Sequence, residues 1–85
     1  MSVTGYVLIE AGPMAIQKLV AKISAIEGVK EACGVTGPFD IIVRAEADDV
    51  AELGELVATK IQTLKGVLRA TTNVVVHTST PAAVQ

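Results

Sequence analysis

The sequence predicts a single α+β domain with the element order β-α-β-β-α-β. Three observations lead to this fold class. Two stretches carry apolar residues at helical spacing, four stretches are typical of strands, and the second half of the chain repeats the pattern of the first. A chain of 85 residues has interior for only one such domain.

The first helix is predicted over residues 13–26. Pro13 suits the first turn of a helix, and Gly28 suits the stop that follows it. The apolar positions recur every three or four residues, as one buried helix face requires: Ile16, Leu19, Val20, Ile23 and Ile26.

The second helix is predicted over residues 49–64, with its apolar stripe at Leu53, Val57, Ile61 and Leu64. Asp48 or Asp49 supplies the N-cap, Glu52 is placed to complete a capping box, and Gly66 ends the helix. Gly54 inside the helix costs about 1 kcal/mol relative to alanine. We interpret it as a site of close approach between helix and sheet.

Strands are predicted at Val3–Glu10, Val29–Thr36, Asp40–Glu46 and Leu68–His77. The helices end on related sequences, IEGV over 26–29 and LKGV over 64–67. Two right-handed β-α-β units of this kind interleave into a four-stranded antiparallel sheet with both helices on one face, the ferredoxin-like arrangement. We expect this domain to span residues 1–77, and we expect residues 78–85, which lack periodicity, to form a flexible tail.

Three strands carry unbroken apolar runs, at 6–9, 41–43 and 74–76. An antiparallel sheet with one wet face alternates apolar and polar residues, and two helices cover only one face. The other face is then an aliphatic patch that a monomer rarely exposes. The strands therefore predict a homo-oligomer, at least a dimer, that buries this face.

Charge and targeting signals exclude several classes of protein. The chain has 7 basic and 9 acidic residues and a net charge of −2, so direct nucleic-acid binding is not expected. The N-terminus lacks a signal-peptide pattern, and no apolar run approaches the ~20 residues of a membrane span. We expect a cytoplasmic protein that does not contact membranes, with Cys33 as an ordinary buried residue.

The sequence offers no catalytic constellation. His77 is the only histidine and has no partner at a metal-ligand spacing, and no serine lies in a nucleophile motif. Carboxylates gather near residue 49, where they favour the helix dipole. We expect no catalytic residues, no metal and no cofactor.

The turn Thr36-Gly37-Pro38-Phe39-Asp40 allows two interpretations. Gly37 and Pro38 reverse the chain, and Asp40 can simply cap the turn through its side chain. Alternatively, backbone N–H groups at the bend bind a carboxylate while the aspartate binds an ammonium group, which together would hold an amino acid.

The segment GVKEACGVTGPFDIIVRA, followed by a helix and LKGVLRATTNVVV, resembles the effector-binding (RAM) domain of the Lrp/AsnC family, the leucine- and asparagine-responsive transcriptional regulators of prokaryotes. The resemblance covers about residues 6–76. It implies a ferredoxin-like domain that pairs through its sheet faces, assembles further, often to octamers, and binds small effectors, typically amino acids, between dimers.

The implied ligand-binding residues are Thr36, Gly37, Phe39, Asp40 and Thr72. Ala70 stands where many members of the family carry a threonine. Full-length members also have an N-terminal helix-turn-helix domain, whereas here the first strand is predicted within about three residues of Met1. The chain therefore resembles a stand-alone module that senses a metabolite alone or joins full-length relatives.

The leading hypothesis is a non-enzymatic amino-acid-sensing and oligomerisation module. Three alternatives remain. A dimeric ferredoxin-like barrel enzyme of the small monooxygenase type would need more aromatic residues than one Tyr, one Phe and no Trp. A purely structural assembly domain would fit the alanine at position 70. An ACT-like regulatory domain is a neighbour at the level of fold.

Overall fold

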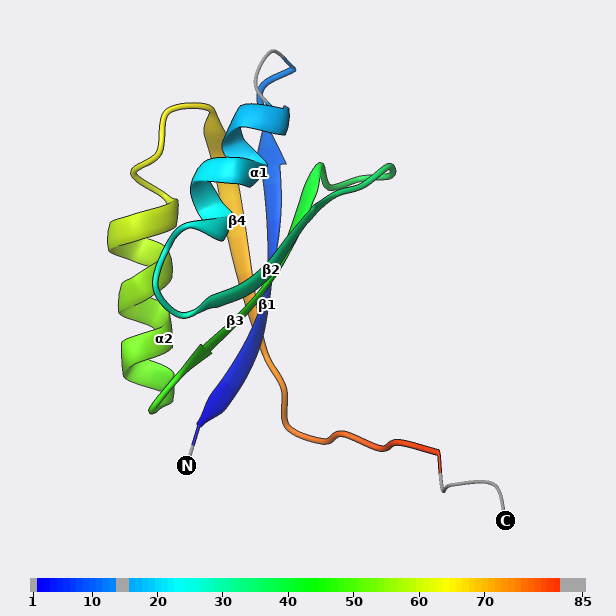
Figure 1. The fold of residues 1–85 in the computed structure, drawn as a ribbon, viewed down its shortest axis with the longest axis vertical. Coiled ribbons are helices and arrows are strands. Elements are labelled where there is room, and N and C mark those ends of the chain that lie inside the picture. Colours follow the sequence, from blue (N-terminus) through cyan, green and yellow to red (C-terminus); the bar gives the residue numbers. More distant parts are fainter. Residues whose placement is uncertain (1, 14–15, 82–85) are drawn as a thin grey trace.

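The computed structural model describes residues 2–13 and 16–81 and confirms the predicted element order. Its strands follow the order β2-β3-β1-β4, with every neighbouring pair antiparallel. Both helices lie on the same side of this sheet, as the ferredoxin-like α+β fold requires (Figure 1). The elements are β1 Val3–Ala11, α1 Ile16–Ser24, β2 Val29–Gly34, β3 Ile41–Ala47, α2 Val50–Leu56 with its continuation η1 Val57–Ile61, and β4 Val67–Val74.

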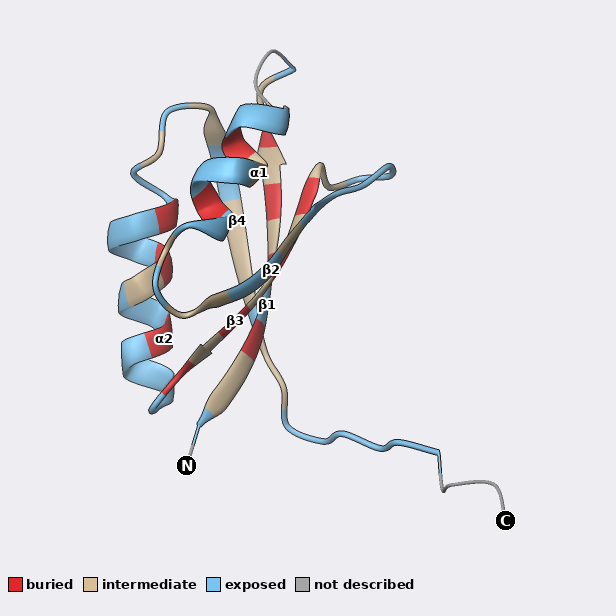
Figure 2. Ribbon diagram, viewed as in Figure 1, coloured by how far each residue is buried: buried red, intermediate tan, exposed pale blue. Residues whose placement is uncertain are grey.

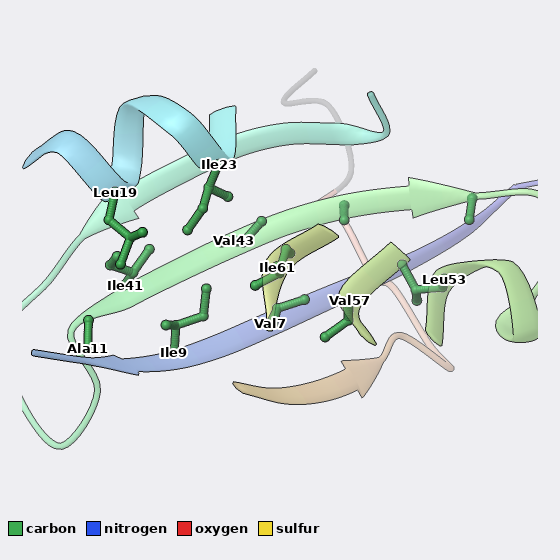
Figure 3. Packing of buried hydrophobic residues seen from close by; sticks show 12 residues of the cluster. Val7, Ile9, Ala11, Leu19, Ile23, Ile41, Val43, Leu53, Val57 and Ile61 are labelled. Atoms are coloured by element: carbon green, nitrogen blue, oxygen red, sulfur yellow. The ribbon is translucent and has the colours of Figure 1, made fainter. Parts of the chain in front are cut away.

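The core is built from the two inner strands and the inward faces of the helices. Alternate residues of β1 and β3 are buried, so that Val7 pairs with Val43 and Ile9 with Ile41 on the helix-covered face. In Figure 2 the buried parts of the helix ribbons lie on the side that faces the sheet, and Figure 3 shows the buried helix side chains pointing toward these strands. The helix residues that complete the core are Leu19, Ile23, Leu53, Val57 and Ile61.

The repeated sequence at the helix ends forms the same chain reversal twice. Gly28 and Gly66 have φ angles of 98° and 104°, a left-handed conformation that glycine adopts without steric cost. The N–H of Val29 donates to the Ile26 carbonyl at 3.0 Å, and the N–H of Val67 donates to the Leu64 carbonyl at 3.2 Å. The internal repeat predicted from the sequence is therefore a repeat of backbone geometry.

The second helix begins as predicted and ends earlier. Asp49 is the N-cap, and its Oδ1 accepts a hydrogen bond from the Glu52 N–H at 2.7 Å. The helix then widens to a π-helix, η1, in which the Gln62 N–H donates to the Val57 carbonyl at 2.8 Å. The Thr59 hydroxyl donates a hydrogen bond to the Glu55 carbonyl at 2.7 Å. Such side-chain bonds compete with the regular helix ladder.

Other predicted boundaries shift by a few residues. The first helix was predicted from Pro13, but residues 14 and 15 lie outside the described residues, and α1 ends at Ser24. The fourth strand ends at Val74, not at His77. The Val75 N–H still reaches the Thr4 carbonyl at 2.8 Å. Beyond this point the chain leaves the sheet (Figure 1).

Two interpretations of single residues were wrong. Gly54 is exposed, and a Cβ atom there would meet nothing within 4 Å, so no close approach to the sheet explains it. The close approach involves Gly5 on β1, where a Cβ would lie 2.6 Å from Cδ2 of the fully buried Leu53. Cys33, expected to be buried, is exposed because it pairs with Ile42 on the face of the sheet that the helices do not cover.

We expect Gly5→Ala to destabilise the protein by about 1–3 kcal/mol, because the added methyl group overpacks the core against Leu53. Urea unfolding at a fixed protein concentration measures the effect. In a Leu53→Ala background the same change should cost much less, because the opposing methyl group is gone. An equal cost in both backgrounds would show that this contact does not restrict position 5.

Gly54→Ala is the matched control, and we expect it to have the opposite sign. The position is exposed, helical and open around its Cβ. Alanine should therefore stabilise the protein by about 0.4–1 kcal/mol through helix propensity and lower entropy of the unfolded chain. A loss of stability measured in the same unfolding assay would contradict the open environment of this glycine.

Candidate functional site

The candidate site is the hairpin that joins β2 to β3, residues 35–40. The Val35 N–H donates to the Asp40 carbonyl at 2.9 Å and closes the hairpin. Gly37 turns the chain with a φ angle of 112°, and its missing Cβ would have no neighbour within 4 Å. Thr36, Gly37 and Pro38 are exposed. The tip of the hairpin therefore presents its backbone to solvent.

Asp40 connects the hairpin to β1 through both its backbone and its side chain. Its N–H donates to the Ile9 carbonyl at 2.9 Å. Its Oδ2 accepts a hydrogen bond from the Ala11 N–H, also at 2.9 Å. Because β3 begins only at Ile41, this side-chain bond satisfies a backbone donor at the end of β1 that the pairing with β3 does not reach. The Asp40 side chain therefore holds the end of β1, and its observed partner lies outside the turn that it was expected to cap.

The same carboxylate keeps capacity for a second interaction. An ionised carboxylate has two oxygens and about four acceptor positions, and the bond to Ala11 uses one of them. Asp40 is half-buried, so its side chain remains accessible from solvent. The carboxylate can therefore hold β1 and accept a charge-assisted hydrogen bond from an ammonium group at the same time.

The structure brings four of the five predicted site residues together. Thr36, Gly37, Phe39 and Asp40 share the hairpin, with Phe39 half-buried beside Asp40. Thr72 lies on β4, which β1 separates from β3. It pairs with Val7, a residue of the helix-covered face, and directly paired residues share a face. Within one chain Thr72 is not part of the hairpin cluster.

Ala70 has a packing role in this structure. It pairs with Ile9, which is fully buried, and it packs against the core as a partly buried residue. A threonine at this position would place a hydroxyl group beside the aliphatic core, where it would need a hydrogen-bond partner. The alanine therefore suits its surroundings in a single chain.

Other residues considered from the sequence form no centre. His77 follows the last strand and is exposed. Within residues 2–13 and 16–81, no group of three or more His, Cys, Asp or Glu side chains is arranged to hold a metal ion. In the same part of the chain, no helix is long and apolar enough to cross a membrane.

Known proteins resemble this chain in sequence and in fold. The chain is 34% identical over 88 residues to a homocitrate synthase of Sulfurisphaera tokodaii. The matched region covers 87% of this chain but only 19% of that protein. TTHA0845 of Thermus thermophilus is 32% identical with a TM-score of 0.86, covering 93% of this chain and 99% of that one.

A transcriptional regulator of Neisseria meningitidis, solved in complex with L-Met, shares the fold with a TM-score of 0.79 at 16% identity. The similarity covers 88% of this chain and 50% of the regulator. The family model described as the Lrp/AsnC ligand binding domain matches residues 4–83. The chain therefore belongs to the Lrp/AsnC ligand-binding domain family.

Proposed function

We propose that the chain is a non-enzymatic module that senses an amino acid, with the hairpin 35–40 as part of the effector site. The observation that carries the proposal is that the Asp40 carboxylate can make two interactions at once. It accepts a hydrogen bond from the Ala11 N–H and retains free acceptor positions beside an exposed glycine turn. Membership of a ligand-binding domain family supports it. So does the L-Met complex of the Neisseria regulator.

The two ends of an amino acid fit different parts of the hairpin. The ammonium group would bind Asp40, and the carboxylate would bind backbone N–H groups near the exposed Gly37. Thr72 is separated from this hairpin by β1, so its hydroxyl would reach the ligand from another subunit. Phe39 would then contact the ligand side chain. A site completed between subunits would link ligand binding to assembly.

The open sheet face supports the homo-oligomer. Its centre is apolar, with Tyr6 43% exposed and Leu8 and Ile42 half-buried. Ion pairs lie around it, between Arg44 and Glu46 at 3.6 Å and between Arg69 and Glu10 at 3.7 Å. An apolar centre with a charged rim is the anatomy of a protein interface. We propose that a dimer forms through this face, and that higher assembly such as an octamer, or joining to full-length relatives, builds on it.

Sensing also accounts for the two kinds of protein in which this domain occurs. One relative is named a homocitrate synthase, and this chain spans about a fifth of it. The Neisseria relative is a transcriptional regulator. A domain that changes its assembly with ligand can regulate either output, because neither catalysis nor DNA binding has to reside in it. The extent of the sensing unit, residues 1–77 with a flexible tail at 78–85, stays a prediction.

A purely structural assembly domain is the second candidate, favoured by the bond between Asp40 and Ala11. If this bond is the whole role of Asp40, the hairpin positions β1 and binds nothing. In the sensing candidate the negative charge of Asp40 binds a ligand, whereas in the structural candidate it does not. Substitutions at Asp40 can distinguish the two.

We expect Asp40→Asn to lower the affinity for the best amino-acid ligand by about 10- to 150-fold, because one charge-assisted hydrogen bond of about 1.5–3 kcal/mol is lost. The asparagine oxygen can still accept the Ala11 N–H, so the melting temperature should change little. A thermal-shift screen of the twenty amino acids identifies the ligand, and calorimetric titration measures its affinity.

Asp40→Ala serves as the paired variant, because it removes the ligand contact and the bond to Ala11 together. We expect it to lose both affinity and melting temperature. If Asp40→Asn binds the ligand as tightly as wild type, or if no amino acid binds, the structural candidate is the correct one.

We expect Leu8→Lys to shift the assembly toward the monomer, because the dimer would have to bury an unpaired ammonium group. Val50→Lys is the control, since Val50 is 56% exposed at the start of α2, outside the open sheet face. Light scattering at micromolar concentration measures both. A wild-type monomer, or a Leu8→Lys oligomer of unchanged mass, would exclude this face as the interface.

A further inference from the structure

A hollow of about 300 Å³ lies at the same end of the sheet as the hairpin, between α1 and the reversal before β4. Figure 1 shows the end of β1 and the η1–β4 connection at this same end of the sheet. A hydrogen bond of 2.9 Å from the Gly12 N–H to the Gly66 carbonyl joins the two connections. The volume of the hollow is at the lower end of the range for small-molecule sites. The hollow is lined by Gly12, Pro13, Lys18, Leu19, Lys22, Lys65 and Gly66.

The charged side chains that line this hollow are all positive. Three of the five lysines of an acidic chain line it, and no carboxylate does. Lys18 and Lys22 are one turn apart on α1 and so lie on one helix face. Lys65 faces them from the other connection. Both ion pairs among the described residues use arginines, so none of these three lysines is engaged in one.

The walls between these lysines are apolar. Leu19 is 2% exposed and forms part of the core, and Pro13 and the two glycines contribute no charged side chain. The three lysines are exposed, so they line the hollow mainly with their methylene chains and carry their charges at its mouth, on α1 and on the η1–β4 connection. A matching ligand carries negative charge at both ends and methylene groups in the middle.

We propose that this hollow binds a short aliphatic dicarboxylate. A free amino acid is disfavoured, because its ammonium group would face three lysines and no carboxylate. Inorganic phosphate would meet the cations but leave the apolar wall uncovered. The site shares no lining residue with the hairpin, so it is independent of the amino-acid site proposed above.

The test is a titration of the full ¹⁵N-labelled chain with glutarate, followed by amide chemical shifts. Saturable shifts are expected at Gly12, Leu19 and Gly66. The Lys18→Gln/Lys22→Gln double variant should weaken binding by about two- to twentyfold, since each exposed charge pair contributes up to about fivefold. Lys65→Glu, which replaces an attraction by a repulsion, should weaken binding by a similar factor. Lys30→Gln removes an exposed lysine outside the hollow and should leave affinity unchanged.

Two further probes decide what is recognised. Glutaramide, which keeps the carbon chain and lacks the charges, should produce no saturable shifts. Inorganic phosphate should bind more weakly than glutarate. Equal affinity for phosphate would mean adventitious anion binding only and would overturn the proposal. So would the absence of saturable shifts with glutarate in a folded sample, or equal weakening by Lys30→Gln.

Discussion

The pairing of β1 with β3 is the constraint on which the rest of this structure depends. All strand residues that are buried belong to these two strands, at every second position. Seven residue pairs, from Val3 with Ala47 to Ile9 with Ile41, fix their register. A slip by one residue would turn the whole buried set away from the helices. The helices then follow, because their apolar faces have only this aliphatic surface to cover.

Asp40 lies at the end of the β1–β3 pairing. This position explains why one residue can both hold the fold together and belong to the proposed ligand site. Its backbone N–H and its carboxylate each hold β1, at Ile9 and at Ala11. The hairpin beyond it is thereby fixed at its base and exposed at its tip. A binding loop anchored on a rigid strand pair loses little freedom when it binds, which is the physical advantage of preorganisation.

The fold could be predicted from the sequence because its signals are local. Periodicity marked the helices, and the glycines at 28 and 66 marked two identical reversals. The errors concern contacts between distant segments. Sequence spacing shows that a glycine is present, but not whether a side chain lies above it, so the close approach was assigned to Gly54 although it involves Gly5. The lysine-lined hollow was missed for the same reason, since Lys65 meets Lys18 and Lys22 only in the folded chain.

The end of β1 joins these features physically. Its last peptide groups are held on opposite sides, with the Ala11 N–H donating to Asp40 of the hairpin and the Gly12 N–H donating to Gly66 beside the hollow. Neighbouring residues of one strand end therefore contact both proposed sites. This segment is already held by both bonds without a ligand, so a ligand at either site would meet a preorganised backbone.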